Sequence, residues 1–201
     1  MNKSTIWLSC GVLRAELEAL HEQGRIGGEL RFLDSMLHMC PPRLETVLSE
    51  RLAQEETRPV VLVYGDCCPR MLDLARQFRV GRVEAVNCAQ LLLGRPRYRE
   101  LMRAGAFLFL PEWTLRWRAI FRDELGLTDA VARDFMREHR KEIVYLDIGL
   151  TPVPQSTMDE CAAYAGLPWR VEKVTMEPLL AALLAAEAAA NGATAAEEKR
   201  A

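Results

Sequence analysis

Residues 59–65 read PVVLVYG, and this continuous run of apolar and β-branched residues decides the fold class. Such a run is typical of a strand buried on both faces, as strands of a parallel sheet are. Residues 67–78, CCPRMLDLARQF, follow with the composition of a helix whose first turn contains Pro69. The order is therefore a buried strand, a pair of cysteines and a helix.

The same alternation of strand and helix recurs along the chain. Besides 59–65, strands are predicted at residues 5–9, 29–33, 81–86, 105–110, 142–149 and 168–176. Besides 67–78, helices are predicted at residues 12–24, 43–54, 111–126, 128–141, 154–166 and 177–190, with a further helix entry at 87–94. Short connections between alternating elements predict an α/β fold with an open, mostly parallel sheet and helices on both faces.

The chain has 201 residues, of which 50% are hydrophobic and 27% charged, so it can bury a sizeable core. We expect a single α/β domain over residues 1–190, or two small lobes within it. The last residues, 191–201, read NGATAAEEKRA; small and charged residues predict a disordered tail.

The net charge of -2 argues against the broad positive field that nucleic-acid binding or attachment to an anionic membrane would use. No apolar run reaches the roughly 18 to 20 residues of a membrane span, and the first twenty residues lack the pattern of a signal peptide. We therefore expect a cytoplasmic protein that binds neither nucleic acid nor membrane.

The cysteines provide the strongest functional signal. In a protein of a reducing compartment, they are expected to be free thiols or metal ligands rather than a disulfide framework. Cys10, Cys67 and Cys88 each follow a predicted strand, and His38 follows the strand at 29–33 by a few residues. Because the carboxyl ends of parallel strands meet at one edge, these four residues are expected to lie there together.

Three thiols and one imidazole form a donor set that suits zinc or an iron centre, including an iron–sulfur cluster. Cys68 and Cys40 are further candidate ligands. None of the spacings is a compact C-x-x-C pair, so the prediction depends on the predicted topology.

Two other interpretations of the cysteines stay open. They can be small apolar side chains that pack at strand ends, which we favour for Cys40 and Cys161. Alternatively, a helix N-terminus and Arg70 lower the pKa of Cys67 or Cys68, giving a thiol nucleophile.

A helix rich in Trp and Arg provides a second candidate site. Its residues are Trp113, Arg116, Trp117, Arg118 and Arg122. They form either a surface for an anionic ligand or partner, or a half-buried helix with aromatic residues inside and arginines outside. No glycine-rich nucleotide motif of a standard type occurs.

Five motifs carry a resemblance to a known family. They are CGVLRAELEAL, LHMCPPRLETVL, VLVYGDCCPRML, NCAQLLLGRPRY and LFLPEWTLRW, in this order. The chain resembles the bacterial and archaeal domain-of-unknown-function family sixteen thirty-eight over about residues 6–184. The family pattern maps onto Cys10, His38, Cys67 and Cys88, while Asn87 replaces an aspartate and Cys68 a small residue.

Members of that family often accompany corrinoid-dependent methyl-transfer systems, which implies a corrinoid or methyltransferase protein as partner. The cysteines predict a metal-binding protein with Asn87 and Glu112 beside the cofactor, and the resemblance implies that it is either accessory to such a step or catalyses it. A partner or cofactor-handling protein without metal and a cysteine-dependent enzyme are the alternatives. Substrate and oligomeric state are left open.

Overall fold

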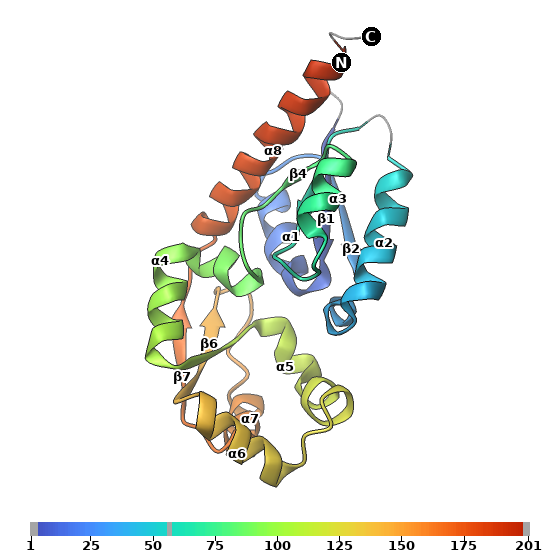
Figure 1. Ribbon diagram of the computed structural model, residues 1–201. Helices are drawn as coiled ribbons and strands as arrows, with labels where there is room; N and C mark the ends of the chain where they lie inside the picture. The colour runs from blue at the N-terminus through green and yellow to red at the C-terminus, as the bar shows by residue number, and fades with distance from the viewer. Residues whose placement is uncertain (1–3, 56–57, 199–201) are drawn as a thin grey trace. The chain divides into compact units, whose positions relative to one another are not determined.

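The computed structural model describes residues 4–55 and 58–198, and the chain divides into two compact units. The first unit comprises Met1–Leu91 and Glu177–Ala201, and the second comprises Leu92–Met176. Each has its own parallel sheet (Figure 1). The α/β class is confirmed, but the strands belong to two open sheets rather than to one.

The first unit contains a four-stranded sheet in the order β2-β1-β3-β4, and every neighbouring pair is parallel. The strands are β1 (Ile6–Cys10), β2 (Glu29–Leu33), β3 (Val60–Val63) and β4 (Gly81–Arg82). All four residues of β3 are buried, as its apolar sequence predicts. Only two residues of the predicted strand at 81–86 pair as β4.

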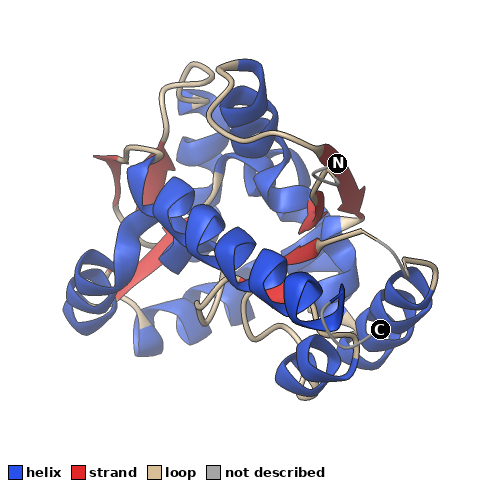
Figure 2. Cartoon of the chain, turned by 90° about the horizontal axis from the view of Figure 1, so that it is seen from above, coloured by secondary structure: helices blue, strands red, loops and turns tan. Residues whose placement is uncertain are grey.

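Helices cover both faces of this sheet. They are η1 (Gly11–Leu13), α1 (Arg14–Glu22), η2 (Ser35–Met39), α2 (Pro41–Ala53), α3 (Met71–Gln77), the start of α4 (Cys88–Ala104), and α8 (Glu177–Glu198). The strands are short compared with the helices around them (Figure 2).

The register of the strands shows which helix covers which face. Trp7, Val61 and Gly81 are in register, so their side chains share one face. Helix α8 lies against that face: a Cβ atom on Gly81 would be 2.2 Å from the carbonyl oxygen of Ala186. The alternate positions of β1, among them Ile6, face α2.

The strand order also defines where a ligand would bind. After β1 the chain goes to β2 on one side and then returns to β3 on the other side of β1. In open α/β sheets, sites form beyond the carboxyl ends of the strands where the order reverses in this way. The carboxyl ends of β1 and β3 therefore mark the expected site.

The second unit contains the three-stranded parallel sheet β5-β6-β7. Its strands are β5 (Ala106–Phe109), β6 (Glu142–Asp147) and β7 (Trp169–Lys173). Its helices are the end of α4, then α5 (Pro111–Arg118), the π-helix η3 (Ala119–Glu124), α6 (Asp129–His139) and α7 (Gln155–Ala165). Helix α4 is interrupted at Gly94, where φ is 71°.

The Trp- and Arg-rich helix of this unit is half buried, in agreement with the second of its two interpretations. Trp117 is only 4% exposed, and the guanidinium of Arg118 lies 4.6 Å from the centroid of its ring. The arginines form ion pairs within the unit: Arg116 with Glu112, Arg118 with Glu160 and Arg122 with Asp129.

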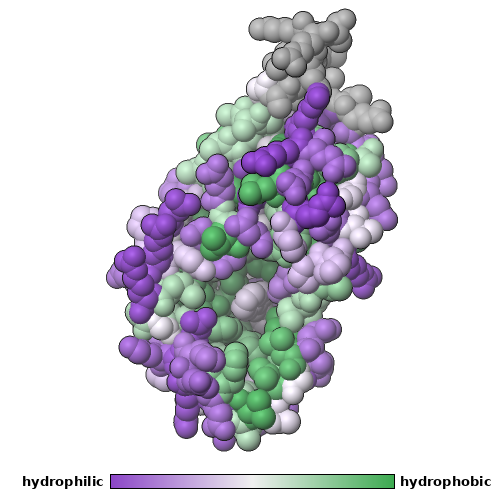
Figure 3. Space-filling model, in the orientation of Figure 1, coloured by the Kyte–Doolittle hydropathy of each residue, from purple (hydrophilic) through white to green (hydrophobic). Residues whose placement is uncertain are grey.

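The surface of the second unit also carries apolar side chains. Those that are large and exposed are Leu115, Leu125, Val131, Phe135 and Leu150. Figure 3 shows apolar colour gathered on the lower part of the face in view. In the part of the chain that the structure describes, no helix has both the length and the apolar character to cross a membrane.

The C-terminal segment differs from the prediction of a disordered tail. Helix α8 continues past Asn191 to Glu198. Residues 199–201 lie outside the described part of the chain.

Candidate functional site

Three cysteines of the first unit converge at the expected edge of the sheet. Cys10 is the last residue of β1, Cys67 follows β3, and Cys88 is the first residue of α4. A hydrogen bond with the Cys10 thiol, followed by burial, raises the pKa of Cys88 well above its ordinary value; the charges of Cys10 and Cys67 act in the same direction. The three thiols are thus close enough to affect one another's ionisation.

Two of the three thiols are buried and the third is half-buried. Cys10 is 4% exposed and Cys88 is 9% exposed, whereas Cys67 is half-buried. Burial, and next the proximity of Cys10, raise the pKa of the Cys67 thiol to about 11. Burial also raises the pKa of the Cys68 thiol. The predicted lowering of these two pKa values is therefore wrong. Desolvation outweighs the nearby N–H group at each thiol and, at Cys68, also the charges of Arg82 and Arg70; at Cys67 the neighbouring charges raise the pKa as well.

The adjacent cysteines Cys67 and Cys68 have different charged neighbours. After burial, Cys10 has the largest effect on the pKa of Cys67, with smaller effects of Cys68 and Asp66, whereas the charged groups that act on Cys68 are Glu45, Arg82 and Arg70. Both are free thiols, as are the other four cysteines. Only the first member of the pair joins the thiol cluster, which we define as Cys10, Cys67 and Cys88.

Tyr64 is a fourth member of the site that the sequence did not single out. It follows β3 directly, is 2% exposed, and its hydroxyl has no hydrogen-bond partner among the described residues. Burial raises the pKa of Tyr64, and the thiol cluster raises it further. A buried hydroxyl without a partner reduces stability, and such groups often mark functional sites.

Replacing Tyr64 by phenylalanine is expected to increase the free energy of unfolding of the metal-free protein by about 1 kcal/mol, because it removes an unsatisfied buried group. Urea denaturation measures this change. Tyr164 provides the matched control, because its hydroxyl donates to the Leu127 carbonyl oxygen at 2.6 Å. Tyr164→Phe is expected to lower the free energy of unfolding by about 1 kcal/mol. An equal decrease in Tyr64→Phe would contradict the prediction.

Glu16 is a further buried group near the cluster. It lies in α1, is 2% exposed, and its charge contributes to the raised pKa of Cys88. The sequence does contain a signal for it. Glu16 falls on the helical stripe formed by Leu13, Leu17 and Leu20, where an apolar residue would be expected.

The loops that hold Cys67 and Cys88 approach each other through Gly65. A Cβ atom at Gly65 would be 2.5 Å from the Cα of Asn87 and 2.7 Å from the carbonyl carbon of Val86. The N–H of Asp66 donates to the Val86 carbonyl oxygen at 3.0 Å. The absence of a side chain at this position therefore permits the close contact that brings the two cysteines together.

Asn87, predicted to lie beside a cofactor, caps α4. Its Oδ1 accepts a hydrogen bond from the N–H of Gln90 at 2.9 Å. The Oε1 of Gln90 in turn accepts from the N–H of Val86 at 2.9 Å. An aspartate could cap the helix in the same way, so the Asn87 departure from the family pattern preserves this contact.

The other predicted site residues each have contacts of their own. His38 lies in η2, half buried, with its Nδ1 against the Ser35 carbonyl oxygen. Glu112 belongs to the second unit, where it forms an ion pair with Arg116, with its Oε1 3.0 Å from Nε. Cys40 is exposed, and Cys161 is buried in α7 of the second unit.

The donor set fits zinc or iron by its chemistry but not yet by its arrangement. Within residues 4–55 and 58–192, whose side chains are described, no group of three or more His, Cys, Asp or Glu is placed to hold a metal ion. The thiol cluster is nevertheless composed of the ligands that these metals select. Metal binding would require the thiols to lose their protons and turn toward a common centre.

Comparison with known proteins gave one match. No curated protein and no solved structure matched the chain. A family model matched residues 32–183, a region that contains His38, Cys67 and Cys88 but begins after Cys10. Because this match spans most of its length, the chain belongs to the family described as "Protein of unknown function (DUF1638)".

Proposed function

We propose that the first unit is a metal-binding module in which Cys10, Cys67 and Cys88 hold a zinc ion. An iron centre is the alternative metal, because thiolates also hold iron–sulfur clusters. The observation that carries the proposal is the convergence of these three thiols where the strand order reverses. His38 is the fourth donor that the sequence indicates, and Glu16 is the buried donor near Cys88.

Bound zinc would supply a Lewis acid that keeps thiolates ionised near neutral pH. The protein residues would limit access of water, because Cys10, Cys88 and Tyr64 are almost fully buried and Cys67 is half-buried. With an exchangeable fourth position the module would suit activation of a substrate thiol or methyl transfer; with a closed position it would be structural. We place it in the cytoplasm, as an accessory to or catalyst of a corrinoid-linked one-carbon step.

Two features of the structure count against the alternatives. The raised pKa values of Cys67 and Cys68 leave few thiolates near neutral pH, which disfavours a thiol nucleophile. Arg118 and Arg122 each form an ion pair within the second unit, which reduces the positive charge available to an anionic partner. Glu112 as a residue facing the cofactor stays a prediction.

Elemental analysis and an ultraviolet–visible spectrum test the proposal on protein purified without oxygen and without a metal-binding tag. We expect about one zinc per chain and no visible colour. Iron with broad visible absorption would favour the cluster instead. Protein that contains neither metal, and that takes up neither when supplied with zinc or iron, would overturn the proposal.

Zinc affinity is expected to rise with pH, because binding displaces thiol protons. The pKa of Cys67 is about 11, so this increase should continue above the ordinary thiol range rather than level off near pH 9. Titration of metal-free protein with zinc at several pH values, under a competing chelator, measures it. An affinity independent of pH would contradict the assignment of thiols as ligands.

A further inference from the structure

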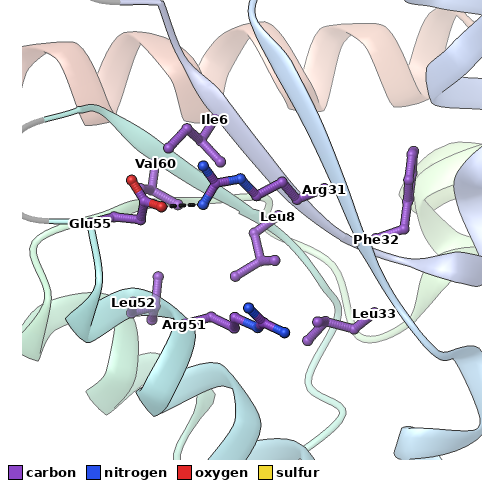
Figure 4. Close-up of a pocket in the computed structure, with 9 residues that line it drawn as sticks. All are labelled: Ile6, Leu8, Arg31, Phe32, Leu33, Arg51, Leu52, Glu55 and Val60. Carbon is purple, nitrogen blue, oxygen red and sulfur yellow. Dashed lines mark hydrogen bonds and ion pairs between the residues drawn. The ribbon is translucent and has the colours of Figure 1, made fainter.

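A pocket of about 290 Å³ lies in the first unit, between α2 and the face of the sheet opposite α8 (Figure 4). Its floor consists of Ile6 and Leu8 from β1 and Val60 from β3. Leu33, from the edge strand β2, and Leu52, from α2, contribute further apolar surface. The volume corresponds to about ten water molecules, at the lower end for small-molecule sites.

Charged groups border this apolar floor. Arg31 pairs with Glu29, with Nε 2.7 Å from Oε1, and also with Glu55. Arg58 pairs with Glu29 on the same side of the sheet, with its Nη1 2.5 Å from Oε2. Figure 4 shows Arg31 directed toward Glu55, so neither group needs a ligand to balance its charge.

Arg51 is the exception. It extends from α2 along the pocket toward Leu33 (Figure 4). The residue is exposed, and within the described side chains its guanidinium has neither an ion pair nor a hydrogen bond. Among the described residues that line the pocket, the charged ones are Arg31, Arg51 and Glu55, which leaves one positive charge in excess. The neighbouring pair of Arg58 and Glu29 is balanced.

We propose that this pocket binds a small monocarboxylate with an aliphatic chain. The carboxylate would pair with Arg51, since a guanidinium fork matches the two oxygens of a carboxylate. The chain, of roughly six to eight carbons, would cover the apolar floor. One unpaired guanidinium suits a single carboxylate better than the several charges of a nucleotide polyphosphate. This site is separate from the thiol cluster and does not depend on a metal.

Calorimetric titration of the full-length protein with hexanoate and with 1-hexanol, which has the same chain without the charge, tests the proposal. Hexanoate is expected to bind at least about tenfold more tightly than 1-hexanol, because it adds charge-assisted hydrogen bonds. Equal affinity for the two would overturn the proposal, and so would no binding of hexanoate up to roughly 10 mM.

Two variants on α2 test whether Arg51 is the residue that binds the carboxylate. Arg51→Met is expected to reduce hexanoate affinity to the level of 1-hexanol. Arg43→Met is the matched control, because Arg43 is exposed on the same helix and does not line the pocket; it should leave both affinities unchanged. Full hexanoate affinity in Arg51→Met would overturn the assignment.

Filling the pocket tests the apolar floor. Leu33→Trp places a larger side chain at a half-buried position of β2, and strands accept aromatic residues well. It should weaken hexanoate and 1-hexanol together, while circular dichroism confirms that the variant is folded. Unchanged affinities in a folded Leu33→Trp protein would place both ligands elsewhere. If the variant does not fold, Arg51→Met and Arg43→Met still test whether the pocket binds hexanoate.

Discussion

Replacing Cys67 by serine is expected to reduce bound zinc from about one ion per chain to near zero. Serine has nearly the same shape, but its hydroxyl does not ionise near neutral pH and is a poor ligand for zinc. The same loss is expected for Cys10→Ser and Cys88→Ser, because the three thiols form one cluster. Elemental analysis of each purified variant, beside a melting curve, measures metal loss separately from unfolding.

Two cysteines provide matched controls. Cys40 is exposed, and Cys68, although adjacent to Cys67, has Glu45, Arg82 and Arg70 as its charged neighbours. Cys40→Ser and Cys68→Ser should therefore keep the full zinc content. Loss of zinc in Cys68→Ser would add that thiol to the ligand set. Full zinc content in all three cluster variants would overturn the metal proposal.

The same measurement distinguishes the two candidate fourth donors. His38→Ala should lower zinc affinity if the imidazole completes the site, and Glu16→Gln should lower it if the buried carboxylate does. Glutamine keeps the size of the side chain but removes its charge. If neither variant changes the affinity, the fourth position belongs to water or substrate, which is the arrangement of a catalytic site.

The placement of the thiol cluster could be predicted from the sequence because it follows from local rules. The apolar run of β3 indicates a strand buried on both faces, and β1 and β3 are indeed parallel neighbours. In parallel strands the carboxyl ends lie at one edge, so residues that follow them meet there. This rule brought Cys10 and Cys67 together without knowledge of the strand order.

The other members of the site could not be predicted in this way. Tyr64 continues an apolar strand, and nothing in its neighbours in sequence shows that its hydroxyl lacks a partner. The divergence of Cys67 and Cys68 depends on which groups α2 and β4 bring near, among them Glu45 and Arg82. These are tertiary contacts, and a pattern along the chain does not contain them.

The division into two sheets was also not predicted from the sequence pattern. Each strand was predicted near its observed place, yet periodicity gives the type of an element and not its neighbours. The first sheet ends at β4, of which only Gly81 and Arg82 pair with β3. The next strand, β5, begins the second sheet instead of extending the first.

Gly65→Ala is expected to lower the free energy of unfolding by about 3 kcal/mol, a large effect for a single methyl group. The new Cβ would be 2.5 Å from the Cα and 2.6 Å from the backbone nitrogen of Asn87. These are backbone atoms at the start of α4, so they cannot move aside as the end of a flexible side chain would. Urea denaturation of metal-free protein measures the loss.

Gly27→Ala is the matched control, because a Cβ at that glycine meets no atom within 4 Å. It should change stability by less than about 0.5 kcal/mol. The Gly65 variant has a second consequence: moving the chain at Asn87 away from Gly65 also moves Cys88 away from Cys67. Its zinc affinity should therefore fall even at temperatures where the variant is folded. A folded Gly65→Ala protein with normal zinc affinity would show that the close backbone contact serves the fold alone and that the metal is held elsewhere.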